Sequence, residues 1–236
     1  DGIGVRPLQG LLPDDELDKI VEEVRLRKGL VSMKTNSDGS QSPYELNITY
    51  FEALSVPGKP DDPMGIQRFL TSQYVAAAFR GVPAVYIHCL TACLNDHEGV
   101  KESGIPRRIN RHKWDVERLD GLLDDSSTIH SKIFNEFTLV LRRRADYPAF
   151  HPDAPQEILE TGKDIFALKR TSKQGDQRIF SISNFTAKNK TVKAMSTLLG
   201  ESSLTQVRDI ISGKNKSISK DGMRLKPFQT VWLVLT

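Results

Sequence analysis

The stretch that most constrains the fold of this chain is a short apolar run at residues 79–87, FRGVPAVYI. The run is entered through a glycine and a proline, and long polar segments lie on either side of it. An apolar run of this length between breakers is typical of a buried strand. Charged residues that crowd the carboxyl end of such a strand are how a (β/α) barrel presents an active site. We therefore predict a barrel strand over residues 79–87.

Amphipathic helices are predicted around this strand. The first covers about residues 14–28, with Asp14 as a plausible N-cap and Gly29 as a good terminator. A second begins at Pro63 and leads into the apolar run, and a third covers about residues 129–144. Each carries apolar residues at helical spacing, such as Leu17, Ile20, Val21 and Val24 in the first. Alternation of helices with an apolar strand implies parallel strands.

Two further regions have a different texture. Residues 30–61 show no sustained period, and their polar section at 34–43 predicts a long loop, which is usually functional in a compact domain. From about residue 153 short strand-like segments recur between Gly, Asn, Ser and Lys, which predicts an all-β sandwich. The expected fold class is α/β plus β, with domains at 1–152 and 153–236.

Composition excludes several classes of protein. With 38% apolar and 27% charged residues, the chain has the balance of a globular protein. A formal net charge of +3 is too weak to indicate nucleic-acid binding, and the basic cluster at 107–113 lacks interleaved aromatics. No apolar run has the ~20 residues that a membrane span needs, so no membrane partner is predicted. No signal peptide is visible, and we expect a cytoplasmic protein.

Neither cysteines nor clustered polar residues predict a metal centre. Cys89 and Cys93 alone make neither a disulfide framework nor a complete zinc site, and small buried residues are the expected role. The run Asn95–Glu98 offers four consecutive ligands, which rarely converge on one ion. We expect no metal ion and no organic cofactor.

Four stretches together resemble one known family. They are DGIG at residues 1–4, SPYELNITYF at 42–51, the apolar run at 79–87, and the segment from Asn95 through Arg108-Ile109-Asn110-Arg111. In combination they resemble the sucrose phosphorylase branch of glycoside hydrolase family 13. The run SPYELN is more similar to the glucosylglycerate phosphorylases of this branch. The resemblance covers essentially the whole chain, and its sandwich is the least specific part.

The resemblance implies the C-terminal part of a (β/α)8 TIM barrel, followed by a C-terminal all-β sandwich domain. Residues 79–87 would be the eighth barrel strand, and Asp1 would end the seventh. The nucleophilic Asp and the acid/base Glu of the family would then lie upstream of Asp1. We therefore expect this chain to be a fragment that releases no glucose 1-phosphate by itself.

The resemblance also implies roles for individual residues. Asp1 would be the third carboxylate of the family, which holds sugar hydroxyls and stabilises the charged transition state. Arg111 would bind the sugar, and Tyr44 and Glu45 would lie on the mobile acceptor loop. Without the resemblance, Asp1 is a frayed terminal acid and Arg111 one member of a basic surface cluster.

Glu45 is a departure from sucrose phosphorylases, which tend to have Gln at this place. A carboxylate there would repel a phosphate dianion unless cations screen it. Donors to a glycerate carboxylate would be supplied by Lys34, Asn36, Ser37 and Ser42, with a solvated polar loop as the alternative. Glucosylglycerate is thus the preferred substrate, with sucrose, sucrose 6′-phosphate and glucosylglycerol as alternatives.

The expected activity is retaining phosphorolysis of an α-glucoside, with inorganic phosphate as co-substrate and α-glucose 1-phosphate as product. The expected partners are therefore small molecules, and the oligomeric state is not predicted. A second hypothesis from another class is a non-catalytic carbohydrate-binding piece. Its sandwich has few aromatics, and they fall mostly within strand patterns that suggest core. Exposure of Trp232 beside other rings would favour that hypothesis.

Overall fold

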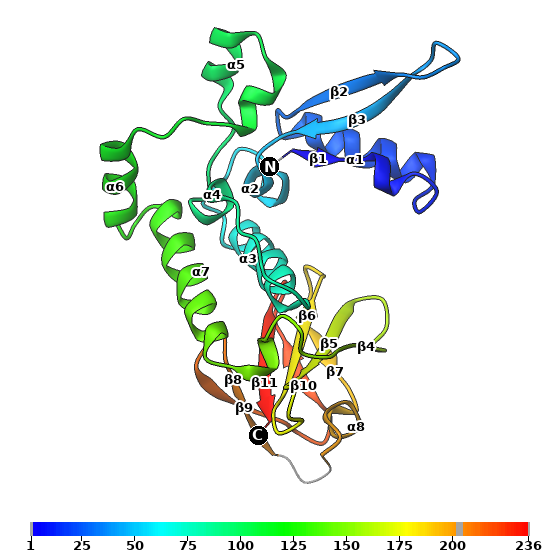
Figure 1. Ribbon diagram of the computed structural model, residues 1–236, viewed down its shortest axis with the longest axis vertical. Helices are drawn as coiled ribbons and strands as arrows, with labels where there is room; N and C mark the ends of the chain where they lie inside the picture. The colour runs from blue at the N-terminus through cyan, green and yellow to red at the C-terminus, as the bar shows by residue number, and fades with distance from the viewer. Residues whose placement is uncertain (1, 202–204, 236) are drawn as a thin grey trace. The chain divides into compact units, whose positions relative to one another are not determined.

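The computed structural model describes residues 2–201 and 205–235, and Figure 1 traces the chain. It divides into two compact units. The N-terminal unit contains residues 1–66 and 85–134, and the C-terminal unit contains residues 67–84 and 135–236. The domain boundary predicted between residues 152 and 153 stays a prediction. The two compact units divide the chain differently, because residues 67–84 and 135–152 belong to the unit that contains the C-terminal sheets.

A small antiparallel sheet organises the N-terminal unit. Its strands are β1 (Ile3–Gly4), β2 (Leu30–Thr35) and β3 (Gln41–Asn47), in the order β1-β3-β2. Helix α1 (Asp14–Leu26) packs its apolar side on this sheet through Leu17, Val21, Val24, Leu46 and Ile48. The remaining helical elements are η1 (Arg6–Leu8), α2 (Tyr50–Leu54), α4 (Ile87–Leu90), α5 (His97–Ser103), η2 (Pro106–Asn110) and α6 (Val116–Asp124).

The first predicted helix is confirmed, and its ends are refined. The N-cap position is Pro13, and Asp14 is the first helical residue, where its charge suits the positive end of the helix dipole. The left-handed residue after the helix is Lys28, with φ 58°, rather than Gly29. Gly29 instead permits close packing, because a Cβ there would lie 2.6 Å from Cγ1 of Val24.

The predicted loop at residues 30–61 is largely wrong. Residues 30–47 form the β2–β3 hairpin, and only its tip at 36–40 has the predicted turn chemistry (Figure 1). Asn36 donates its N–H to the carbonyl of Ser40 at 2.8 Å, and Asp38 Oδ1 accepts the N–H of Ser40 at 3.0 Å. The polar composition of the strands hid them, because this hairpin buries little of its outer half.

The predicted strand at residues 79–87 is also wrong as a strand. Residues 82–86 belong to no helix or sheet, and α4 begins at Ile87. Val82 is 80% exposed, and Tyr86 and Ile87 are 41% and 48% exposed. A strand needs a neighbour to take its backbone hydrogen bonds, and none of the described residues pairs with this segment as a strand.

The C-terminal unit contains the predicted all-β sandwich. Its six-stranded antiparallel sheet has the order β4-β5-β6-β11-β8-β9, and a two-stranded sheet pairs β10 with β7. The strands are β4 (Gln156–Leu159), β5 (Ile165–Thr171), β6 (Arg178–Asn184), β7 (Lys190–Val192), β8 (Gln206–Asp209), β9 (Lys214–Ser217), β10 (Met223–Leu225) and β11 (Thr230–Leu235). Both sheets contribute to one core, in which Phe180 and Val231 meet Val192 and Met223, and α8 (Met195–Leu199) adds to it.

The other face of the large sheet is covered by helical segments of the same unit. Helices α3 (Pro63–Ala78) and α7 (Ile129–Ala145) have residues in both units, and η3 (Pro148–Phe150) follows α7. Trp232 is fully buried on this face, with the rings of Tyr74 and Phe150 at 6.2 and 4.7 Å. Pro63 is the first residue of α3, as predicted.

Candidate functional site

Four of the polar residues that the sequence singled out lie on the β2–β3 hairpin, with Lys34 on β2 and Ser42, Tyr44 and Glu45 on β3. Gly4 pairs with Glu45 and Ile3 pairs with Leu46, so the N-terminal run lies beside the strand. The register between β2 and β3 shifts at Ser32 and Met33, which pair with Glu45 and Pro43. Tyr44 is therefore the extra residue of a β-bulge, and its carbonyl accepts the N–H of Val5 at 3.2 Å. Bulges re-aim the side chains next to them and are common beside active sites.

Glu45 forms an ion pair with an arginine from η2. Nε and Nη2 of Arg107 lie 2.7 and 2.6 Å from the same oxygen, Oε2. The Glu45 side chain is 13% exposed and that of Arg107 is 45% exposed. The other oxygen, Oε1, lies against Gly2, where a Cβ would come within 2.7 Å. This carboxylate is thus enclosed on one side and neutralised on the other.

Asn110 completes this group. Its side chain is almost fully buried, and its Nδ2 would lie 3.3 Å from a Cβ on Gly2. Its Oδ1 is buried and has no hydrogen-bond partner among the described residues. Gly2, Glu45, Arg107 and Asn110 therefore converge from three separate segments of the N-terminal unit. We call these four residues the Glu45 cluster.

A second carboxylate, Asp96, anchors the segment that carries Arg107. Its Oδ1 accepts the N–H of Gly99 at 2.8 Å and caps α5, while Oδ2 lies 2.8 Å from Nη1 of Arg108 and 3.0 Å from Nδ1 of His112. Burial alone would raise the pKa of Asp96, but these three groups together lower it below its ordinary value. Asp96 is consequently charged at neutral pH and holds both sides of η2.

His88 packs beneath this segment rather than facing an open pocket. It is 6% exposed, its Nε2 lies 3.0 Å from the carbonyl of His112, and its ring stacks on Tyr86 at 4.8 Å. Burial lowers the pKa of His88, which favours the neutral ring. Among the described residues, no group of three His, Cys, Asp or Glu side chains is arranged to hold a metal ion.

The other predicted site residues lie outside the Glu45 cluster. Arg111 follows η2 directly, its backbone held by Arg108 and its side chain exposed, and it has no ion-pair partner within residues 2–201 and 205–235. Lys34 and Ser42 pair across the outer hairpin, where Ser42 donates to Oδ1 of Asn36 at 3.1 Å. Tyr44 is 39% exposed. Asp1 lies outside the described residues.

The structure also identifies residues that sequence reasoning missed. Arg107 was grouped with Arg108 and Arg111 as an undivided basic cluster, whereas each has a different environment. Asn110 and Gly2 had no role of their own. The available hint was the requirement for a cation near Glu45, because a largely buried carboxylate needs one.

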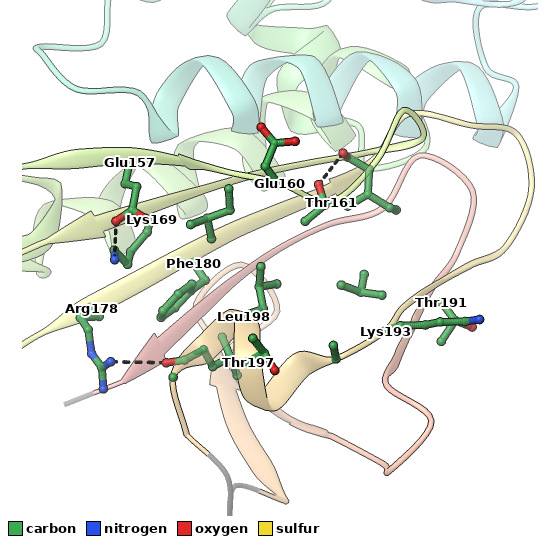
Figure 2. A pocket seen from close by; sticks show the side chains of 16 residues that line it. Glu157, Glu160, Thr161, Lys169, Arg178, Phe180, Thr191, Lys193, Thr197 and Leu198 are labelled. Carbon is green, nitrogen blue, oxygen red and sulfur yellow. Dashed lines mark hydrogen bonds and ion pairs between the residues drawn. The ribbon is translucent and has the colours of Figure 1, made fainter.

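A hollow in the C-terminal unit is lined by apolar side chains and by charged side chains, several of which are already paired. It encloses about 640 Å³ between the large sheet and α8, with Phe180 and Leu198 among its lining residues (Figure 2). Lys169 and Glu157 at its rim are paired with each other at 2.5 Å, and Arg178 is paired with Glu201 at 2.7 Å. Charged groups already paired in this way do not suggest catalysis. Of the rings predicted to be core, Phe180 and Trp232 are buried, whereas Phe185 is 47% exposed.

Comparisons with known proteins agree with the resemblance of the motifs. No model of a known protein family matches the chain. A glucosylglycerate phosphorylase of Allomeiothermus silvanus is 35% identical over 235 residues, which are 99% of this chain and 39% of that protein. A glucosylglycerate phosphorylase of Escherichia coli is 32% identical over 235 residues, again 99% of this chain and 40% of that protein. The chain thus spans about two fifths of the length of these relatives.

A solved structure shows the same fold. The sucrose 6F-phosphate phosphorylase of Thermoanaerobacter thermosaccharolyticum matches 97% of this chain and 39% of its own, with a TM-score of 0.63 and 22% identity. At this identity the match supports the arrangement of helices and sheets. The fold of the chain is therefore that of the matching part of this solved structure, as the fold class predicted.

Proposed function

Because this chain belongs to the sucrose phosphorylase branch of glycoside hydrolase family 13, we propose that it forms part of a retaining α-glucoside phosphorylase. The enzyme would transfer a glucosyl group to inorganic phosphate and release α-glucose 1-phosphate. Similarity to two glucosylglycerate phosphorylases over 99% of the chain carries this proposal. Glucosylglycerate is the preferred substrate for the same reason. Sucrose and sucrose 6′-phosphate are the alternatives.

The roles proposed for the described residues follow from their places beside η2 and in the β2–β3 hairpin, whereas the role of Asp1 follows from the resemblance of its motif alone. Asp1 would hold the sugar hydroxyls as the third carboxylate, and the exposed guanidinium of Arg111 would bind the same sugar. Tyr44 and Glu45 would border the acceptor side, where the bulge turns the strand. Lys34 and Ser42, on the outer hairpin, would offer donors to the departing moiety.

Phosphorolysis of this kind needs no organic cofactor in our proposal, since carboxylates and phosphate supply the chemistry. Arg107 offsets part of the charge of Glu45, so Glu45 opposes phosphate binding less than an unpaired carboxylate would. We place the enzyme in the cytoplasm, where a charged sugar phosphate would be retained. No helix in the described part of the chain is long and apolar enough to cross a membrane.

The carbohydrate-binding alternative loses its main support. Exposure of Trp232 beside other rings would have favoured it, and Trp232 is fully buried. We therefore propose catalysis in the complete gene product, with the N-terminal unit contributing one side of the substrate site.

The test uses the complete gene product that contains this chain. Phosphate-dependent release of α-glucose 1-phosphate is measured from glucosylglycerate, sucrose and sucrose 6′-phosphate, and kcat/KM should be highest for glucosylglycerate. Arg111→Gln should lower kcat/KM about a hundredfold or more, as loss of a charge-assisted contact at the sugar. Arg25→Gln, which removes an exposed arginine paired with Glu22 on α1, is the matched control. Absence of phosphate-dependent release would refute the activity, and a strong sucrose preference would refute the interpretation of Glu45.

A further inference from the structure

Only one edge of the Arg107 guanidinium has a partner among the described residues. Its Nε and Nη2 both contact Oε2 of Glu45, so the ion pair occupies one edge of the planar group. Its Nη1 has no hydrogen-bond or ion-pair partner among the described residues, and the side chain is 45% exposed. A guanidinium presents two such edges, and each fits the two oxygens of a carboxylate or phosphate. Glu45 therefore orients Arg107 through one edge of the guanidinium, and the edge that contains Nη1 is left for a ligand.

The neighbouring arginine is not available in the same way. Arg108 is neutralised by Asp96 at 2.8 Å, and the side chains of both are largely buried. Arg107 and Arg108 are adjacent in sequence but have different environments, because η2 is a 3₁₀ helix with three residues per turn. Side chains three apart eclipse in such a helix, which places Arg107 and Asn110 on one face. That face turns toward Gly2 and Glu45.

Asn110 adds to this face a polar group that has no hydrogen-bond partner among the described residues. It is 1% exposed, and its buried Oδ1 has no partner among the described residues. A buried carbonyl oxygen of this kind accepts a hydrogen bond from a hydroxyl. An arginine edge beside a hydroxyl acceptor matches a small hydroxy acid, which carries both a carboxylate and a hydroxyl.

We propose that Arg107 is the specificity-determining residue that binds the carboxylate of the departing hydroxy acid, with Glu45 as its positioning residue. This inference rests on the proposed function and names the contact that selects glycerate. Glu45 also limits which anion fits. A carboxylate carries one negative charge and inorganic phosphate carries between one and two at neutral pH, so Glu45 repels phosphate more strongly at this place.

Lys34 and Ser42 are less suited to this particular contact. Ser42 lies three residues from Glu45 along β3, and Lys34 lies two residues along β2 from Ser32, the partner of Glu45, so their backbones are roughly 7–10 Å from Glu45 at the rise of a strand. Glycerate is too small to reach the Glu45 cluster and the outer hairpin at once. The two sets of donors therefore make different predictions for substitutions.

The test is a comparison of Michaelis constants in the complete gene product. For phosphorolysis of glucosylglycerate, Arg107→Gln should raise the KM for glucosylglycerate roughly tenfold to a hundredfold, with a much smaller rise in the KM for phosphate. Glu45→Gln should raise the KM for glucosylglycerate less and lower the KM for phosphate. In the reverse direction, Arg107→Gln should reduce the preference for D-glycerate over glycerol as acceptor at least about tenfold. Arg25→Gln is the control for loss of a surface arginine.

The outcomes separate this inference from the proposed function. If the wild type releases α-glucose 1-phosphate and Arg107→Gln raises the KM for phosphate instead, Arg107 serves phosphate and the inference is overturned. If Lys34→Gln changes the glycerate preference and Arg107→Gln does not, the carboxylate binds at the outer hairpin and the inference is equally overturned. The double variant Glu45→Gln/Arg107→Gln avoids an unpaired buried carboxylate and should show the same rise in the KM for glucosylglycerate as Arg107→Gln. A wild type without phosphorolysis refutes the proposed function itself.

Discussion

The carboxylate of Glu45 lies directly against the α-carbon of Gly2, so that a methyl group at position 2 would come within 2.7 Å of Oε1. Gly2 also has φ +96°, a conformation that residues with a side chain rarely adopt. The close approach orients Glu45 toward Arg107 from the opposite side. Position 2 therefore contributes to the site through its lack of a side chain.

Gly2→Ala should disturb the Glu45 cluster more than it disturbs the fold. We expect a loss of about 1–2 kcal/mol in the free energy of unfolding from the positive φ. Displacement of Glu45 should also raise the KM for glucosylglycerate in the complete gene product. Urea denaturation and steady-state kinetics measure the two effects, and an unchanged KM would contradict the contact between Gly2 and Glu45.

Gly29→Ala should destabilise the packing between α1 and the small sheet. The added methyl group would lie 2.6 Å from Cγ1 of Val24 and 3.0 Å from Cβ of Ile48. We expect a cost of about 1–3 kcal/mol in the free energy of unfolding, measured by urea denaturation. Gly121→Ala is the matched control, since its Cβ would meet nothing within 4 Å and α6 should gain up to about 1 kcal/mol. Equal effects of the two substitutions would refute the packing argument.

The two thiols should be nearly unreactive in the folded protein. Burial raises the pKa of Cys89 to about 11 and that of Cys93 to about 12. Because only the thiolate reacts, both should be modified by a disulfide reagent at pH 8 at least about a hundredfold more slowly than in urea. The rate of absorbance change in the two conditions is the measurement. Rapid modification of either thiol in the native state would contradict its burial.

Asp96→Asn should make stability less dependent on pH in the acid range. The pKa of Asp96 is lowered on folding, so its carboxylate stabilises the fold above the unfolded pKa of about 3.9, and this contribution is lost as the pH falls through the folded pKa. We expect the variant to be less stable by about 1–2 kcal/mol at pH 6, with the difference shrinking below about pH 4.

Urea denaturation at pH 6, 5, 4 and 3 measures this difference for Asp96→Asn. The control is Asp15→Asn, because Asp15 is paired with Lys19 on an exposed surface of α1. That substitution should change the free energy of unfolding by less than about 0.5 kcal/mol at each pH. A constant difference between Asp96→Asn and the wild type from pH 6 to pH 3 would disprove the role of the charge.

Sequence periodicity predicted the three long helices α1, α3 and α7 because their apolar stripes are local. In α7 the stripe Ile133, Phe137 and Val140 is buried as its spacing indicates. The strand expected at residues 79–87 failed for the complementary reason, since pairing depends on a neighbour that a local pattern does not specify. The β2–β3 hairpin was missed because its polar outer half lacks the alternation that identifies a half-buried strand.

The candidate site was predictable only in part for a similar reason. Tyr44 and Glu45 were identified from the resemblance of their motif, but the partner of Glu45 lies 62 residues away in η2. The sequence raised only the condition that cations would have to screen Glu45 from phosphate, and it did not specify which arginine would do so. The three-residue turn of η2 makes that choice, because it directs Arg107 and Arg108 to different carboxylates.

The bulge at Tyr44 divides the hairpin into an inner and an outer section. Pairs from Leu30–Asn47 to Ser32–Glu45 are fixed by β1 and the core, whereas pairs from Met33–Pro43 outward belong to the tip. An extra residue between them absorbs local changes in twist and register. The tip can therefore change in length or sequence without moving Glu45 from its place against Gly2 and Arg107. The hairpin thus combines a fixed inner section with an outer section that tolerates insertions and substitutions.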